Sequence, residues 1–236
     1  TVGPLVLAFV LWRRGGALKA WLIGALTFIV SQLVLRLPWQ VPLNAWLAPK
    51  LKESPALLVG WLVVSALTAG LFEETGRWLA YRTLWKDRST LGGLMLGAGH
   101  GGFESMVLVG LSLISSTVLY VALTHGTTLG LPPEVVPLVE KQFAEVTPLL
   151  SFLGGVERIA ALMLHLACSL LVLEAVRRHD KRWLGASIGA HFTLNVVGVA
   201  LTKWVHPLVG EAALLGLGAA LLVGALRWAS PRPATR

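Results

Sequence analysis

The chain has 236 residues, of which 55% are hydrophobic and 14% are charged, and its formal net charge is +8. Soluble domains carry about 25% charged residues, so this composition, with a mean hydropathy of +0.72, excludes an ordinary soluble protein. Long apolar runs separated by short charged patches predict an all-α fold, a bundle of several transmembrane helices. The basic residues lie in the short loops between these runs, which indicates membrane topology and no nucleic-acid partner.

Seven transmembrane helices are expected, in a single domain that covers residues 1–236. Their approximate ranges, in chain order, are 2–12, 17–36, 56–82, 91–123, 149–176, 183–203 and 207–228. The third to fifth exceed the roughly 20 residues that a bilayer requires, so they are expected to tilt, kink or project into water. Of the connecting segments, Pro38–Pro55 is expected on the membrane surface, and Pro133–Thr147 is expected to form a short amphipathic helix.

Basic residues gather in every second connection, which predicts the orientation of the chain in the membrane. The basic group comprises Arg13, Arg14, Lys19, Arg82, Lys86, Arg88, Arg177, Arg178, Lys181, Arg182, Arg227, Arg232 and Arg236. By the positive-inside rule, these connections face the cytoplasm. The N-terminus is therefore expected outside the membrane and the C-terminus in the cytoplasm.

Several ionisable or amide side chains fall inside the expected helices, where they are costly and usually functional. Four of these residues, one from each of four helices, lie eight to twelve positions along the chain from the nearest basic connection: Glu74, His100, His165 and His191. At about 1.5 Å per residue, all four are about 12–18 Å from that boundary. Scattered structural histidines would have no reason to agree in depth. The agreement predicts one polar site in the cytoplasmic half of the bilayer.

Spacing of four residues adds partners to this site. Glu73 and Arg77 can pair on one helix face, and Glu104 can orient His100 in the same way. Asn195 stands in the same relation to His191. Glycines surround His100, and they either permit close helix approach or let the backbone unwind beside a cavity.

The chemistry of this set suits hydrolysis of an amide. A desolvated carboxylate can act as a general base on water, and imidazole and amide groups can donate hydrogen bonds to an oxyanion. Three histidines, His100, His165 and His191, could equally hold Zn²⁺ with a water in an open position. The residues leave both possibilities, no cofactor or zinc, open. The single cysteine, Cys168, is expected to be a small buried hydrophobe.

Three motifs carry a family resemblance: EETGR at 73–77, HGGFE at 100–104 and HFTLN at 191–195. In this order they resemble the glutamic-type intramembrane proteases, which include the CPBP (CAAX-processing) enzymes, the PrsW proteases and the YhfC family, often described as intramembrane metalloproteases. The resemblance covers roughly residues 55–200 and is closest to YhfC. CPBP enzymes usually read EExxxR and place their histidine after an aromatic spacer. This chain has its arginine one residue closer, in EETGR, and its histidine first, in HGGFE. The resemblance therefore gives no support for a prenylated protein as the substrate.

The resemblance implies a protease of the bacterial inner (plasma) membrane that cuts a membrane-associated protein or peptide, with a catalytic core at about residues 55–203. Carried over by position, Glu73 or Glu74 would activate water. His100 and His191 would bind the water, the oxyanion or a metal, and Asn195 would support the oxyanion. Arg77, Glu104 and His165 would be supporting residues, with His165 included for its depth alone. The cavity is expected to open toward the cytoplasmic half.

Two other functions remain open from the residues. A proton- or cation-coupled transporter also uses Glu, His and Arg inside its helices, although the chain has no inverted repeat and is short for that class. A non-catalytic scaffold that binds metal at a degenerate site is the other alternative.

Overall fold

A computed structural model describes residues 2–229, and all regular structure in this range is helical. In chain order the helices are α1 (Val2–Arg13), α2 (Leu18–Phe28), α3 (Leu37–Glu53), α4 (Pro55–Thr83), α5 (Thr90–Glu104), α6 (Leu111–Thr124), α7 (Val136–Glu145), α8 (Pro148–Arg177), α9 (Arg182–Trp204) and α10 (Pro207–Ala229). Two π-helical segments, η1 (Ile29–Arg36) and η2 (Ser105–Gly110), join α2 to α3 and α5 to α6. The predicted all-α membrane fold is confirmed. Arg232 and Arg236 lie outside the described residues.

Within residues 2–229, six helices are long and apolar enough to cross a membrane. The expected first span forms α1, which has 12 residues and is shorter than the roughly 20 that a bilayer requires. The expected surface segment Pro38–Pro55 instead continues α2 and η1 as one helical stretch of 36 residues, Leu18–Glu53. The expected amphipathic helix is present as α7, and the Phe143 ring packs edge-on against Tyr120.

Short polar side chains begin the long helices where the sequence leaves the preceding loop. Ser54 accepts a hydrogen bond from the amide of Leu57 at the start of α4, and Thr147 caps α8 in the same way. Ser89 caps α5, and its hydroxyl also donates to Asp87 Oδ2 at 2.6 Å. This hydrogen bond lowers the pKa of Asp87, which lies in the loop between α4 and α5.

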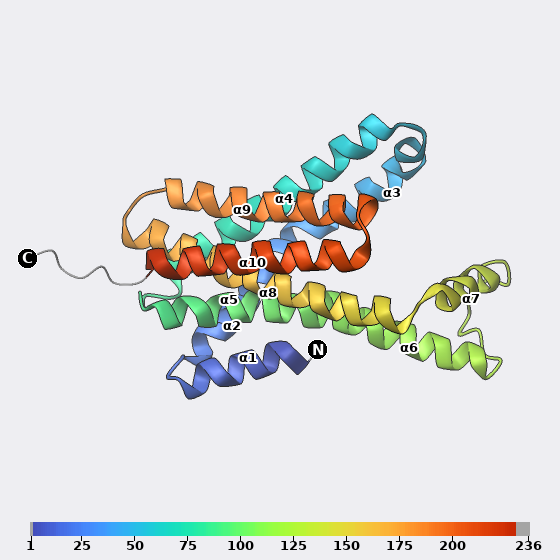
Figure 1. The fold of residues 1–236 in the computed structure, drawn as a ribbon, viewed down its shortest axis with the longest axis horizontal. Helices are drawn as coiled ribbons and strands as arrows, with labels where there is room; N and C mark the ends of the chain where they lie inside the picture. The colour runs from blue at the N-terminus through green and yellow to red at the C-terminus, as the bar shows by residue number, and fades with distance from the viewer. Residues whose placement is uncertain (1, 230–236) are drawn as a thin grey trace, which may run out of the picture.

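The loops richest in basic residues meet at one end of the bundle (Figure 1). Arg177 donates to the carbonyls of Arg88 and Ala229, so the α4–α5 loop and the end of α10 are tied to the end of α8. Behind these loops lies a hydrophobic core in which Met95, Leu96 and Leu170 are fully buried. The bundle is therefore filled with apolar side chains at its basic end.

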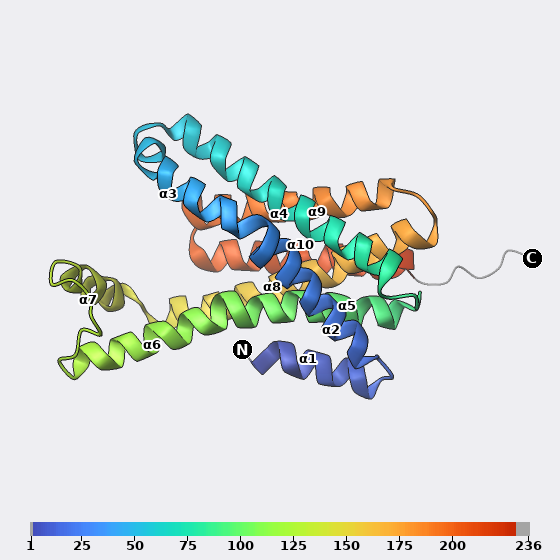
Figure 2. The same cartoon turned by 180° about the vertical axis from the view of Figure 1, so that it is seen from behind.

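At the other end, the helices separate into two arms. Figures 1 and 2 show α3 with the first half of α4 on one arm, and α6, α7 and the start of α8 on the other. The arms diverge where η1 and η2 interrupt the α-helical geometry. Wide π-helical turns are frequent at functional sites, and both of these segments line the cavity described below.

Glycines allow α5 to approach α2 and α8 closely. A methyl group added at Gly99 would overlap the backbone carbonyl of Trp21, and one at Gly24 would overlap that of Leu96. Gly97 lies in the same way against the backbone of α8 at His165. The α5 helix stays continuous from Thr90 to Glu104. The glycines around His100 therefore serve close helix packing, and the backbone does not unwind there.

Gly99→Ala is expected to lower the stability of the fold strongly, because the added methyl meets a rigid carbonyl on α2 and overpacking costs about 1–3 kcal/mol or more. Thermal unfolding of the detergent-purified protein measures this. Gly60→Ala is the matched control, since nothing lies within 4 Å of its added methyl. Equal melting temperatures for the two variants would contradict the packing that we describe.

Candidate active site

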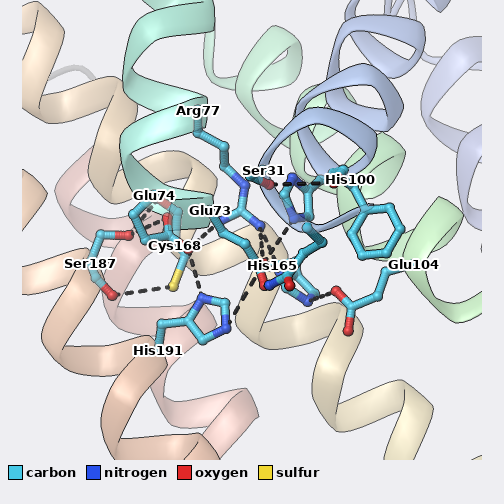
Figure 3. Close-up of polar contacts among 12 residues, drawn as sticks. Ser31, Glu73, Glu74, Arg77, His100, Glu104, His165, Cys168, Ser187 and His191 are labelled. Atoms are coloured by element: carbon cyan, nitrogen blue, oxygen red, sulfur yellow. Dashed lines mark hydrogen bonds and ion pairs between the residues drawn. The ribbon is translucent and has the colours of Figure 1, made fainter. Parts of the chain in front are cut away.

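The two adjacent glutamates of α4 point into different surroundings (Figure 3). Glu73 Oε2 lies 2.9 Å from His100 Nε2 and 3.7 Å from Arg77 Nη2, and Glu73 Oε1 accepts a short hydrogen bond from Gln32. Glu73 also lines a large cavity. Of the two carboxylates, it is therefore the one that a substrate in the cavity can reach.

Glu74 is fully enclosed, and both of its oxygens are taken by protein groups. Oε1 accepts from Arg77 Nη1 at 2.5 Å and from His191 Nδ1 at 2.8 Å, and Oε2 accepts from Ser187 Oγ at 2.8 Å. Glu74 is absent from the lining of the cavity, as judged from residues 2–229. Its contacts join α4 to α9 and hold the His191 ring in one orientation.

The partners of His100 determine which ring nitrogen carries the proton. Nδ1 lies 2.8 Å from Thr27 Oγ1, and this hydroxyl already donates its own proton to the carbonyl of Gly24 at 2.6 Å. Thr27 can then only accept, so the proton sits on Nδ1 of His100. Nε2 lies 2.9 Å from the Glu73 carboxylate, which can also only accept, so both ring nitrogens of His100 face acceptors in this arrangement. An ion held between Nε2 and Glu73 would take the Nε2 lone pair of a neutral His100, as in metal-binding histidines.

His191 is oriented in the same way by Glu74. Because a carboxylate can only accept, the proton of a neutral His191 lies on Nδ1. Nε2 then faces Glu73, with 3.9 Å between Nε2 and Glu73 Oε2. The expected orienter, Asn195, lines the cavity but makes no hydrogen bond to these side chains within the described residues.

His165 has the opposite arrangement. Arg77 Nη2 donates to its Nδ1 at 2.6 Å, because a guanidinium has no acceptor. Its Nε2 lies 2.7 Å from Glu104 Oε2. Glu104 thus neighbours His165, whereas the spacing predicted that it would orient His100. The lone pair of Nδ1 is occupied, so His165 could bind a metal only after it lost the contact with Arg77.

The fold brings all eight sequence-predicted residues to one region. Seven of them are joined by direct contacts: Glu73, Glu74, Arg77, His100, Glu104, His165 and His191. The rings of His100 and His165 have centroids 5.1 Å apart, and those of His165 and His191 5.4 Å. The predicted pairing of Glu73 with Arg77 is present. The functional roles of all these residues stay predictions.

A cavity of about 540 Å³ extends from this cluster. Its wall follows α4 from Glu73 back to Leu62, α8 from His165 back to Glu157, and α9 from His191 on to Thr202. All three paths lead away from the basic loops. The cavity therefore extends toward the opposite end of the bundle, and not toward the basic end as we expected, because the apolar core fills that end.

Carboxylate, imidazole and thiol donors in the cluster fit a transition-metal ion such as zinc. Ligand atoms of Glu73, His100, Glu104 and His165 lie within 4.8 Å of one another, and so do those of Glu74, Cys168 and His191. The candidate ligands thus form two groups, with His191 in a different group from His100 and His165, whereas the sequence predicted one set of three histidines.

Several contributors were missed by the sequence analysis. They are Thr27, Ser31, Gln32 and Arg36 on the α2–η1 helix, and Ser187 on α9. The signal was available, because polar residues at positions 31, 32 and 36 interrupt an apolar run. Thr27 and Gln32 reach the cluster from outside the predicted core of residues 55–203. Farther along the cavity wall, Arg158 pairs with Glu157, its neighbour on α8.

The fold and the cluster define a polytopic membrane protein with a buried carboxylate–imidazole site. The chain belongs to the YhfC intramembrane metalloprotease family, whose pattern matches residues 2–213. It is 33% identical over 210 residues to "Uncharacterized membrane protein YhfC" of Bacillus subtilis (strain 168), a match that covers 85% of this chain and 81% of the relative. No solved structure matches the chain significantly. The family predicted from the three motifs is confirmed.

Glu74→Gln is expected to destabilise the protein more than Glu73→Gln. The first change leaves the fully buried Arg77 without its closest carboxylate, and breaking a buried ion pair costs about 3–5 kcal/mol. Glu73 faces the cavity, so the loss of its charge should cost less. Thermal unfolding of both variants measures the difference, and a larger loss for Glu73→Gln would contradict the roles that these contacts indicate.

Proposed function

We propose that this protein is an intramembrane protease that hydrolyses peptide bonds of a membrane-associated polypeptide, with Glu73 at the centre of its catalytic site. The observation that carries this proposal is the position of Glu73, which lines the cavity while Nε2 of His100 and Nε2 of His191 face its carboxylate. Membership of a metalloprotease family supports the same reaction class.

In the proposed reaction, Glu73 takes a proton from the attacking water and returns it to the leaving amine. General acid–base catalysis of this kind contributes about 10²–10⁴-fold. Glu74 keeps His191 in place through its hydrogen bond, and Thr27 does the same for His100. Asn195, on the cavity wall, is proposed to support the oxyanion. Arg77, Glu104 and His165 position these groups.

We propose zinc as the resident metal. Nε2 of His100 and Oε2 of Glu73, which contact each other at 2.9 Å, would hold it together with Nε2 of His191, because the other polar atoms of these residues are occupied by Thr27, Gln32 and Glu74. A bound zinc ion lowers the pKa of water and polarises a carbonyl. If these three residues hold it, the other carboxylate on the cavity wall, Glu104, is the remaining candidate for proton transfer.

The direction of the cavity supports access from the end opposite the basic loops. With those loops in the cytoplasm, the substrate would enter from the outer half of a bacterial plasma membrane. The alternative of a transporter requires a path through the bundle. The apolar core at the basic end, with Leu170, Leu173 and Met95 fully buried, gives that alternative no support.

Cleavage should depend on Glu73. The purified protein, reconstituted in vesicles, can be tested against a library of quenched fluorescent apolar peptides. Glu73→Gln is expected to lower the cleavage rate by about 10²–10⁴-fold, because the amide can neither act as a base nor supply the anionic oxygen of a metal ligand. Glu140→Gln, on the distant helix α7, is the matched control and should cleave normally. Unchanged cleavage by Glu73→Gln would refute the proposed role.

Metal content provides a test that is independent of activity. Elemental analysis of the protein, purified without chelators, is expected to find near-stoichiometric zinc that is lost in the His100→Ala/His191→Ala double variant. Asn195→Ala should keep its zinc, since this residue makes no hydrogen bond to the cluster within residues 2–229. Cleavage by a protein that contains no metal would instead assign water activation to the Glu73 carboxylate alone.

A further inference from the structure

Arg36 is a buried cation that the proposed reaction does not use. It ends the π-helical segment η1, is only 8% exposed and lines the cavity. Its guanidinium donates to Gln32 Oε1 at 2.8 Å, to the carbonyl of Ser65 at 2.7 Å and to Thr68 Oγ1 at 3.2 Å. All three acceptors are neutral, and no carboxylate of the described chain lies within 4 Å of Arg36.

Three other buried or half-buried arginines, two of them near the cavity, are paired with carboxylates. Arg77 contacts Glu74, Arg158 contacts Glu157, and Arg177 contacts Glu174. A charge inside a membrane protein is costly unless it is paired or functional. A guanidinium has five N–H donors, and the three neutral contacts leave two of them unused. Arg36 therefore has both charge and hydrogen-bonding capacity to offer to an anion in the cavity.

The distance from Arg36 to the catalytic centre can be estimated along α4. Its partners Ser65 and Thr68 precede Glu73 by eight and five residues, which correspond to about 12 and 7.5 Å at 1.5 Å per residue. An extended polypeptide advances about 3.3 Å per residue. An anion at Arg36 would therefore lie about two to four residues from a peptide bond held at Glu73.

We propose that Arg36 binds a carboxylate of the polypeptide substrate, either an acidic side chain or the C-terminus, about two to four residues from the cleaved bond. This inference rests on the proposed protease function. The planar guanidinium suits bidentate recognition of a carboxylate. Gln32 couples this subsite to the catalytic one, because it accepts from Arg36 and donates to Glu73.

The same chemistry could come from a lipid phosphate. We favour the substrate because Arg36 shares one cavity with Glu73 and His191, inside the bundle. Balance of the charges of Glu73 and Glu104 is the simpler structural role for Arg36. That role predicts a change of stability in Arg36 variants but no change in the preference for an anionic ligand.

Binding of apolar decapeptides to the protein in phosphatidylcholine nanodiscs tests the proposal. One fluorescent peptide carries a glutamate, and its matched partner carries a glutamine at the same position. The Glu73→Gln background prevents cleavage and retains an acceptor for Gln32. We expect at least about tenfold tighter binding of the glutamate peptide. Arg36→Gln should abolish this preference, and Arg36→Lys should keep part of it, because charge remains without the planar fork.

Arg158→Gln is the matched control, since Arg158 lines the same cavity but is already paired with Glu157. It should retain the preference for glutamate. No preference in the parent protein, or an equal preference in Arg36→Gln, overturns the proposal. Phosphatidylglycerol nanodiscs could also abolish the preference of the parent protein while peptide binding by Arg36→Gln stays the same in both lipids. That result would assign the subsite to a lipid phosphate and would overturn the proposal as well.

The binding assay separates this proposal from the protease function. A preference that depends on Arg36, in a protein that cleaves no peptide, would support the subsite and refute the protease. Cleavage that depends on Glu73, with no preference for a carboxylate, would refute the subsite alone. If both hold, moving the glutamate along a cleavable peptide should give fastest cleavage when it lies two to four residues from the cut.

Discussion

The arrangement of the site depends on one buried ion pair, between Arg77 and Glu74 on α4. Both side chains are fully buried, and Arg77 Nη1 lies 2.5 Å from Glu74 Oε1. Arg77 also donates to His165 on α8, and Glu74 accepts from Ser187 and His191 on α9. A lone buried charge is costly, so both members of the pair need partners. The hydrogen bonds that they make to α8 and α9 hold these helices against α4 at the same depth. The remaining groups of the site take their positions from this contact.

The same constraint separates the surroundings of two adjacent glutamates. Neighbouring residues on a helix point about 100° apart, so only one of them can face Arg77, Ser187 and His191 at close range. Glu74 does, and Glu73 is directed to His100 and the cavity. Glu74 orients His191 beside the carboxylate that faces the cavity. A double glutamate next to an arginine is thus a way to place one carboxylate at a cavity inside an apolar bundle.

Packing decides from which side the site can be reached. Glycines on α5 let α2 and α8 approach so closely that the basic end of the bundle is filled with side chains such as Met95 and Leu170. At the π-helical segments η1 and η2 the helices diverge, and the cavity opens between them. Toward the basic end, the cavity wall therefore passes Arg36 before it reaches Glu73. This order is compatible with the proposed hydrolysis of a polypeptide that lies in the membrane.

The sequence by itself determined the membrane class, the family, most of the helices and the common layer of Glu74, His100, His165 and His191, because hydropathy and the cost of intramembrane charge act along the chain. It also predicted the pairing of Glu73 with Arg77, but not the contributions of Thr27, Gln32 and Ser187. Only the tertiary structure decided that Glu104 lies against His165, that Glu74 orients His191, and that Glu73 faces the cavity. These contacts join different helices, and helix rotation and crossing are set by side-chain packing. Spacing along one helix cannot report such packing.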